Sequence, residues 1–232
     1  MQKKETEVRI LHLLKEAENA RGTAVVIDVF RAFTVEGFLL AGGAAKLIPV
    51  AEEEKARAYT DAVKVGERKG YRLEGFDYGN SPSAIQQADV RGKTVVHTTS
   101  AGTQGIEACM PYADEVLVAA LTNAKATAEY IVQSGVKNVS LLATGLMGER
   151  DTEEDVLCAE YIRALILGED TAEILKEVPT LRYTEGKKFF DPLQQDRFPQ
   201  ADFALCIDTD RFPFAMKVIR EGDAYRTVRV DL

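Results

Sequence analysis

The chain has 232 residues, 46% of them hydrophobic, which is enough to bury the core of one large α/β domain or two small ones. Its net charge of −8 argues against a nucleic-acid binder that works by neutralising phosphates, although a small anionic substrate is not excluded. No apolar run approaches the roughly 20 residues that a transmembrane helix needs. The charged run at residues 1–7 leads into no apolar signal segment, so we expect a cytoplasmic protein.

The three cysteines, Cys109, Cys158 and Cys206, are odd in number and far apart in the sequence. They indicate reduced, buried side chains, without a disulfide framework or metal-binding spacing. A catalytic cysteine is disfavoured because it needs a base, and His12 and His97 are the only histidines.

Short apolar runs alternate along the chain with helical patterns. They predict strands at residues 24–29, 46–50, 94–98, 115–119 and 139–143, with helices at residues 51–63, 103–110, 123–134 and 152–167. Apolar strands without alternation are typical of sheets covered on both faces. The pattern therefore predicts an α/β sandwich with a largely parallel sheet.

The last part of the chain departs from this alternation. Residues 189–199 are polar and aromatic and predict a connection or a short helix, and residues 204–208 predict a strand. Residues 218–228 predict a hairpin that turns at residues 221–223. We therefore expect a mixed sheet with its antiparallel strands at one side, in a single domain over residues 1–232.

Polar residues follow several predicted strands, at the sheet edge where α/β proteins bind ligands. Asp28 ends an otherwise apolar strand, and a buried carboxylate is costly unless it is paired or binds a metal. We interpret Asp28 as a magnesium ligand, or as a nucleophile or base. The alternative is a structural ion pair with Arg31 or a cap on the following helix.

A second such strand leads into residues 98–103, which are small, hydroxylated or glycine. Their hydroxyl and backbone N–H groups are suited to holding a phosphoryl group at a helix N-terminus, with Thr99, Ser100, Gly102 and Thr103 as candidates. The same residue types also cap helices without any ligand. The loop is not a Walker A motif, because the lysine is missing.

The loop-rich stretch from residue 66 to residue 82 mixes charges with glycines. Glu67 and Arg68 suit a metal ligand and an anion clamp, or else form a solvated pair of little energetic value. Asn80 and Ser81 are candidates for substrate contacts, and a helix cap before a first-turn proline is the alternative.

Two further patterns have structural explanations. Residues 152–155 read as a capping box, and for Glu154 and Asp155 capping is the favoured interpretation from the pattern alone. His97 lies within an apolar strand, which favours a core histidine with one satisfied nitrogen over a general base.

Taken together, these segments resemble the 2-phosphosulfolactate phosphatase family, the magnesium-dependent acid phosphatases of coenzyme M biosynthesis. The matching stretches are residues 26–32, 66–68, 75–82, 98–103 and 154–155. The resemblance implies a three-layer α/β/α fold with bound Mg²⁺, and hydrolysis of a phosphate monoester of a small sulfonated 2-hydroxy acid. It implies metal or catalytic roles for Asp28, Glu67 and Asp155, and anion binding by Arg31, Arg68 and residues 98–103.

The chain departs from the family pattern at several positions. Ala101 stands where asparagine is expected, and Phe30 and Phe33 replace smaller residues, which would crowd the pocket. The leading hypothesis is a Mg²⁺-dependent phosphatase acting on a small anionic phosphate ester, in a homodimer because twofold assemblies are commonest. The alternatives are a non-catalytic anion-binding or metabolite-binding protein on the same scaffold, and a metal-dependent hydrolase with another substrate.

Overall fold

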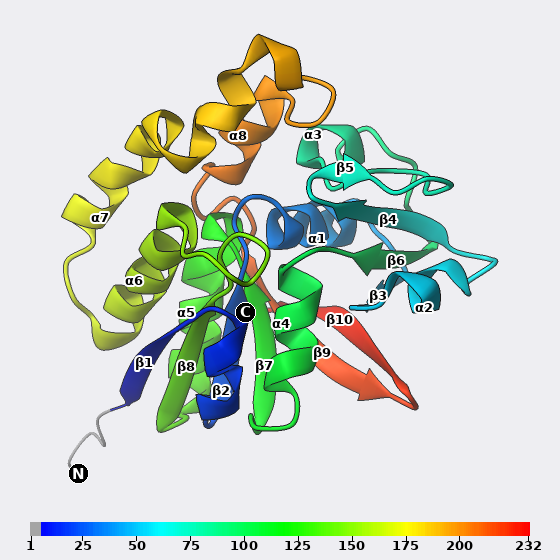
Figure 1. Cartoon of the computed structure of the whole chain (residues 1–232). Coiled ribbons are helices and arrows are strands. Elements are labelled where there is room, and N and C mark those ends of the chain that lie inside the picture. Colours follow the sequence, from blue (N-terminus) through cyan, green and yellow to red (C-terminus); the bar gives the residue numbers. More distant parts are fainter. Residues whose placement is uncertain (1–5) are drawn as a thin grey trace.

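The computed structural model describes residues 6–232, and most of this part of the chain folds around one mixed sheet (Figure 1). The charged N-terminal run, for which we expected no signal segment, lies largely outside the described residues. The strands are β1 (Glu7–His12), β2 (Thr23–Ile27), β3 (Lys46–Pro49), β4 (Val63–Arg68), β5 (Tyr71–Arg72), β6 (Thr94–Thr98), β7 (Glu115–Ala119), β8 (Asn138–Ala143), β9 (Phe214–Glu221) and β10 (Ala224–Asp231).

The helices lie mainly between these strands. They are α1 (Ala32–Ala41), α2 (Glu53–Arg57), α3 (Pro82–Ile85), α4 (Gly102–Cys109), α5 (Ala124–Ser134), α6 (Glu153–Leu167), α7 (Ala172–Glu177) and α8 (Gln200–Cys206). Short 3₁₀ helices add η1 (Leu14–Asn19), η2 (Leu121–Asn123), η3 (Val178–Tyr183), η4 (Glu185–Phe190) and η5 (Pro192–Gln194). Within residues 6–232, none of the helices combines the length and apolar character that a membrane crossing requires.

The sheet consists of two parallel halves joined by an antiparallel hairpin. Strands β1, β8, β2 and β7 form one half, and β3, β6 and β4 form the other. Hairpin β9–β10 lies between them, since β9 pairs with β7 and β10 pairs with β3. The predicted mixed α/β sheet is confirmed, but the prediction that the antiparallel strands lie at one side is wrong.

The burial of β9 explains this central position. Phe214, Ala215, Met216 and Val218 are all buried, which is the pattern of a strand covered on both faces rather than of an edge strand. The predicted turn is confirmed, because Glu221 pairs with Ala224 across a two-residue loop in which Gly222 has φ +63°.

Helices cover both faces of the sheet, consistent with a three-layer α/β/α sandwich. In Figure 1, α4 and η1 lie on the near face of the first half, and α5 and α6 lie behind it. The main apolar core extends into both halves, from Val25 in β2 to Val95 in β6. Predicted helices 103–110, 123–134 and 152–167 correspond to α4, α5 and α6.

Two other predictions are wrong. The helix predicted over residues 51–63 is only α2, since Val63 begins β4 and pairs with Val95. The strand predicted over residues 204–208 lies largely in helix α8, which buries Asp202, Phe203 and Cys206 on one face. Periodicity cannot separate a strand from a buried helix over so short an apolar run.

The two halves of the sheet run in different directions, so their carboxyl ends approach each other. In Figure 1, β2, β7 and β8 run up the view and β4 and β6 run across it. The segment from α7 to α8 arches above the place where these ends meet. This arrangement brings loops from both halves and the C-terminal helical segment around a single pocket.

Candidate active site

A pocket of 410 Å³ lies at the carboxyl ends of strands from both halves of the sheet. Asp28 follows β2, Gly145 follows β8, Glu67 lies near the end of β4, and Ser100 follows β6. The predicted metal candidates Asp28, Glu67 and Asp155 all line this pocket, and none is more than 8% exposed. Residues far apart in the sequence therefore meet in one cavity, as the strand-end argument predicts.

The loop before α4 connects Asp28 to Glu67. The Ser100 backbone N–H donates to Glu67 Oε1 at 2.7 Å, and the Gly102 N–H donates to Asp28 Oδ2 at 3.0 Å. A Cβ atom at Gly102 would lie 2.8 Å from Ala32 Cβ, so only glycine fits this close approach. These two amides therefore hold carboxylates in place, whereas the sequence analysis expected them to hold a phosphoryl group.

The remaining candidates in this loop stabilise its shape. The Thr99 N–H donates to Thr103 Oγ1 at 2.9 Å, and the Thr103 N–H donates back to Thr99 Oγ1 at 3.2 Å. Both threonines are buried, and neither lines the pocket. Of the residues predicted to bind substrate in this loop, only Ser100 reaches the pocket, next to Ala101.

Asp155 joins the ends of two strands. Its Oδ1 accepts from the Val29 N–H at 2.8 Å and its Oδ2 from the Gly145 N–H at 2.9 Å. The predicted capping box is wrong, because Thr152 makes no side-chain cap and its buried Oγ1 has no partner within residues 6–232. Asp155 thus fixes the pocket wall behind Asp28.

Glu154 is the acidic residue that the sequence pattern did not select for the site. It is 3% exposed and lines the pocket, and its Oε2 has no hydrogen-bond partner among the described residues. The pKa of Glu154 is raised to about 7, and burial is the main cause. The charges of Glu185 and Asp28 add to this rise, and the charge of Lys188 opposes it. The only signal in the sequence was the Glu154–Asp155 pair within the family resemblance; the pattern alone indicated a helix cap.

Asp28, Glu154 and Asp155 repel one another. Burial raises the pKa of Asp28, and the neighbouring Glu67 charge adds to this against hydrogen bonds from the Ala32 and Gly102 amides. Burial also raises the pKa of Asp155 well above its ordinary value, and the Glu154 and Asp28 charges raise it further. A bound cation would relieve this repulsion.

The carboxylates of the pocket can supply only part of the coordination shell of Mg²⁺. Within residues 6–232, no three His, Cys, Asp or Glu side chains are grouped closely enough to form a metal cage on their own. Mg²⁺ however usually binds one or two carboxylates and completes its shell with water and substrate phosphate. Glu154 Oε2 suits that mode, and each oxygen of Asp28 accepts a single hydrogen bond and keeps a second lone pair. In Glu67, by contrast, one oxygen already accepts from two donors, whereas each oxygen of Asp155 accepts one backbone N–H, as in Asp28.

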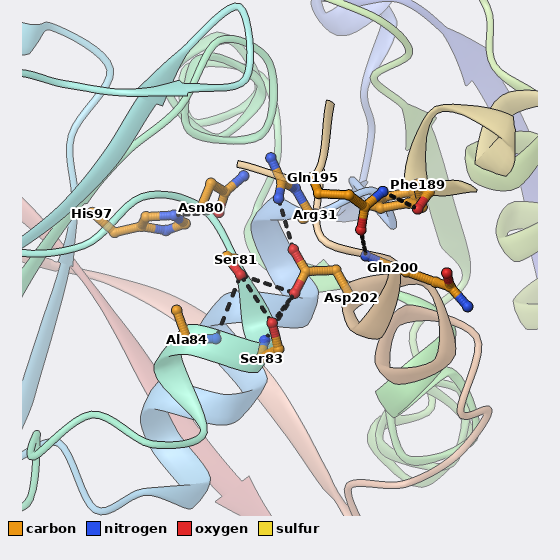
Figure 2. Close-up of polar contacts among 10 residues, drawn as sticks. All are labelled: Arg31, Asn80, Ser81, Ser83, Ala84, His97, Phe189, Gln195, Gln200 and Asp202. Atoms are coloured by element: carbon orange, nitrogen blue, oxygen red, sulfur yellow. Dashed lines mark hydrogen bonds and ion pairs between the residues drawn. The ribbon is translucent and has the colours of Figure 1, made fainter. Parts of the chain in front are cut away.

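Arg31 also lines the pocket, and a buried carboxylate holds it in place. Its Nη1 lies 2.7 Å from Asp202 Oδ2, and both side chains are at most 3% exposed. Figure 2 shows Asp202 reaching from α8 toward Arg31 on one side and toward Ser81 and Ser83 on the other. Ser81 caps α3 and donates to Asp202 at 2.9 Å, and it does not line the pocket.

Asn80 reaches the pocket and is oriented by His97. His97 is fully buried, and its Nε2 lies 3.1 Å from Asn80 Oδ1 while its Nδ1 lies 3.0 Å from Glu36 Oε1. The core histidine is confirmed, with both nitrogens bonded rather than one. Figure 2 shows the Asn80 amide nitrogen directed away from His97, toward Arg31.

Arg68 does not lie in the pocket. Its guanidinium donates to the carbonyls of Glu67 and Ala51, at 2.7 and 3.0 Å, and to Thr98 Oγ1. These bonds hold the end of β4 against the neighbouring loop. Of the two phenylalanines expected to crowd the pocket, Phe30 lines it and Phe33 lies in the core.

We expect the ionisation of Glu154 to contribute a fall of about 3 kcal/mol to the free energy of unfolding of the metal-free protein as pH rises from about 4 to about 8. The pKa of Glu154 is raised from 4.5 to about 7 on folding, so its stabilising contribution is complete below the lower value and lost above the upper one. Urea denaturation of wild type and Glu154→Gln across this range measures the contribution as the difference between the two proteins. The fall should be smaller in Glu154→Gln than in wild type, whereas Glu153→Gln, at the exposed neighbouring position, should keep the wild-type fall. An equal fall in the Glu154→Gln protein would contradict the assignment.

The chain is similar to several known proteins. A family model described as 2-phosphosulpholactate phosphatase matches residues 9–220. A protein of Bacillus subtilis (strain 168) named probable 2-phosphosulfolactate phosphatase is 30% identical over 215 residues, covering 89% of this chain and 91% of that protein. Proteins of the same name from Clostridium perfringens (strain 13 / Type A) and Caldicellulosiruptor saccharolyticus are 34% and 33% identical, each over 72% of this chain and over 70% and 71% of their own lengths.

These matches place the chain among the phosphoric monoester hydrolases. More narrowly, the chain belongs to the 2-phosphosulpholactate phosphatase family, and the resemblance noted in its sequence is confirmed.

Proposed function

We propose that this chain hydrolyses the phosphate monoester of a small acidic metabolite in a Mg²⁺-dependent reaction, with 2-phosphosulfolactate as the first substrate to test. The observation that carries the proposal is the pocket itself. It brings the buried Glu154, whose Oε2 has no partner among the described residues, together with Asp28 and Arg31 in one lining. The relatives' names supply the substrate.

Asp28 and Glu154 would hold the cation. When bound, Mg²⁺ would neutralise charge on a phosphoryl oxygen and lower the pKa of a water that attacks phosphorus. Glu67 and Asp155, which the sequence analysis also proposed as ligands, accept backbone hydrogen bonds that fix the loops around the pocket.

The chain's own donors then act on the phosphoryl group. Arg31 is fixed by Asp202 and needs little reorganisation to stabilise negative charge on the transferring group. The Asn80 amide and the unpartnered Thr152 hydroxyl line the same cavity and are available to donate hydrogen bonds. Hydrolysis breaks the bond between phosphorus and the ester oxygen, and the water oxygen replaces that oxygen on phosphorus.

Phosphate release from a panel of phosphorylated 2-hydroxy acids tests the proposal, with Mg²⁺ added or removed by a chelator. We expect Mg²⁺-dependent release that is fastest with 2-phosphosulfolactate, and sulfolactate as the product by mass spectrometry. Tight calorimetric binding of these esters without turnover would favour the non-catalytic anion-binding alternative. That alternative rests on Ala101, which lines the pocket at the position where the family resemblance led us to expect asparagine. Turnover of another ester only would favour a metal-dependent hydrolase with a different substrate.

Mg²⁺ should also stabilise the fold, and by more at about pH 8 than at about pH 6. Metal binding requires deprotonated carboxylates, and those of Asp28, Glu154 and Asp155 have raised pKa values. Thermal unfolding with and without Mg²⁺ measures this without relying on turnover. The shift should disappear in Asp28→Asn; a shift that is independent of both pH and Asp28 would place the cation elsewhere.

The homodimer expected from the sequence stays a prediction that gel filtration can test.

A further inference from the structure

Three cationic side chains surround the ring of Phe198 at one side of the pocket. Arg31 Cζ lies 5.0 Å, Arg197 Cζ 4.7 Å and Lys188 Nζ 5.4 Å from the ring centroid. All four residues line the pocket. Each cation gains from the aromatic face, but like charges gathered around one ring also repel one another.

Only one of the three has a carboxylate partner within residues 6–232. Arg31 is paired with Asp202, whereas neither Lys188 nor Arg197 takes part in an ion pair or a side-chain hydrogen bond in this part of the chain. Arg197 Nε is moreover buried without any partner among these residues. Arg150, which also lines the pocket, has a carboxylate partner, because its Nη1 lies 2.7 Å from Glu185 Oε1.

Contacts with the surrounding protein hold the segment that carries Lys188 and Arg197 in a defined position. Gln195 Nε2 donates to the Phe189 carbonyl at 2.9 Å, and its Oε1 accepts from the Gln200 N–H at 2.9 Å (Figure 2). The same Nε2 also donates to the Asp191 carbonyl at 2.9 Å. This side chain ties together the ends of the segment that carries Lys188 and Arg197.

The β4–β5 turn holds Arg197 from the other side. A Cβ atom at Gly70 would lie 2.7 Å from Arg197 Nε and 2.7 Å from Phe198 Cζ, so glycine is needed for this contact. Arg197 also stacks on the Tyr71 ring at 4.3 Å. The guanidinium is therefore ordered before any ligand arrives, which lowers the entropic cost of binding an anion.

The pocket lining carries two groups of charges, which we call the carboxylate side (Asp28 and Glu154) and the cationic side (Arg31, Lys188 and Arg197). Asp28 and Glu154 suit a cation with its phosphate, and Lys188 is close enough to lower the pKa of both carboxyls. Lys188 and Arg197 are cations in addition to Arg31, which we assign to the phosphoryl group. Two unpaired cations in one partly enclosed cavity match one further oxyanion.

We propose that Lys188 and Arg197 form a subsite for a second anionic group of the substrate, a carboxylate or sulfonate on the carbon chain that bears the phosphate. The proposal rests on the proposed phosphatase function. It assigns the choice of an acidic substrate to the C-terminal helical segment, which contains none of the five sequence stretches that carry the family resemblance.

The test compares two phosphate esters that differ only in the second anion. 2-Phospholactate carries a carboxylate where isopropyl phosphate carries a methyl group. In Lys188→Met and Arg197→Met we expect kcat/KM for 2-phospholactate and 2-phosphosulfolactate to fall by about 10- to 100-fold, mainly through KM. At saturating Mg²⁺ the value for isopropyl phosphate should fall less than that for 2-phospholactate in both variants, and by less than about threefold in Arg197→Met, because that ester leaves the subsite empty.

Lys187→Met is the matched control, since Lys187 is the exposed neighbour on η4 and does not line the pocket. It should behave as the wild type with every ester. Equal losses for isopropyl phosphate and 2-phospholactate in Lys188→Met and Arg197→Met would overturn the subsite and show that these cations bind the phosphoryl group. Urea denaturation checks that the variants remain folded.

Calorimetry separates failure of the subsite from failure of the phosphatase proposal. Sulfolactate and inorganic phosphate are titrated separately into the wild type and the two variants. Weaker sulfolactate binding with unchanged phosphate binding would support the subsite even in a protein without turnover. Unchanged sulfolactate binding in both variants would overturn it, whatever the enzyme activity.

Discussion

Asp28→Asn is expected to lower Mg²⁺-dependent phosphate release by about 1,000-fold or more. Asp28 follows β2 at the centre of the carboxylate side of the pocket, and the Ala32 and Gly102 amides fix its orientation. Replacing it with asparagine removes the charge that a cation needs while keeping nearly the same shape. Loss of about 4 kcal/mol of electrostatic stabilisation of the transition state corresponds to this change in rate. Initial rates at saturating Mg²⁺ measure it.

Asp61→Asn is the control for this experiment, because Asp61 is exposed and remote from the active-site pocket. It should retain wild-type turnover. A rate within about threefold of wild type in Asp28→Asn would remove Asp28 from the mechanism. The substituted amide keeps one oxygen that can accept from the Ala32 N–H, so the variant should still fold.

Asp202→Ala is expected to lower the free energy of unfolding by about 3–5 kcal/mol. The change leaves the buried guanidinium of Arg31 without a counter-ion and removes the acceptor of Ser81 and of the Ser83 amide. Urea denaturation measures the loss. Arg31→Met combined with Asp202→Ala should recover part of it, since no charge is then buried alone.

The exposed pair of Asp208 and Arg211 provides the comparison. Its atoms lie 2.6 Å apart, but the side chains of Arg211 and Asp208 are 34% and 47% exposed, so Asp208→Ala should cost less than about 1 kcal/mol. A loss below about 1 kcal/mol for Asp202→Ala as well would show that the buried pair contributes no more than the exposed one. It would also contradict the proposal that Asp202 fixes Arg31 for catalysis.

The sequence predicted the carboxylate side of the pocket because its residues follow apolar strands. Asp28, Glu67 and Ser100 each stand at or just beyond the end of a strand, and such ends meet at one edge of a sheet. Local patterns were less informative where two explanations use the same residue types. Glu154 and Asp155 fit a helix cap equally well, and only the structure shows Asp155 bonded to Val29 and Glu154 lining the pocket with a buried Oε2 that has no partner among the described residues.

The cationic side was not predictable in the same way. Lys188 and Arg197 lie among short 3₁₀ turns and Asp202 lies in the short helix α8, and this segment has no hydrophobic period to place it on the sheet. The position of Arg197 depends on its close approach to Gly70, which is distant in the sequence, and on the hydrogen bonds of Gln195 within the segment. For Arg68 the sequence suggested a site role that the structure does not support. Its place beside Glu67 suggested an anion clamp, but its guanidinium donates hydrogen bonds to the carbonyls of Glu67 and Ala51 and to the Thr98 hydroxyl.

Crystals soaked with Mn²⁺ in place of Mg²⁺, together with phosphate, test most directly whether the carboxylate side of the pocket binds a cation. Anomalous diffraction locates Mn²⁺ without reference to activity. The account predicts one strong peak within a coordination distance of about 2.0–2.6 Å of carboxylate oxygens of Asp28 and Glu154, with phosphate bound beside it. A crystal saturated with Mn²⁺ that shows no peak in this pocket, or a peak only elsewhere on the molecule, would contradict it.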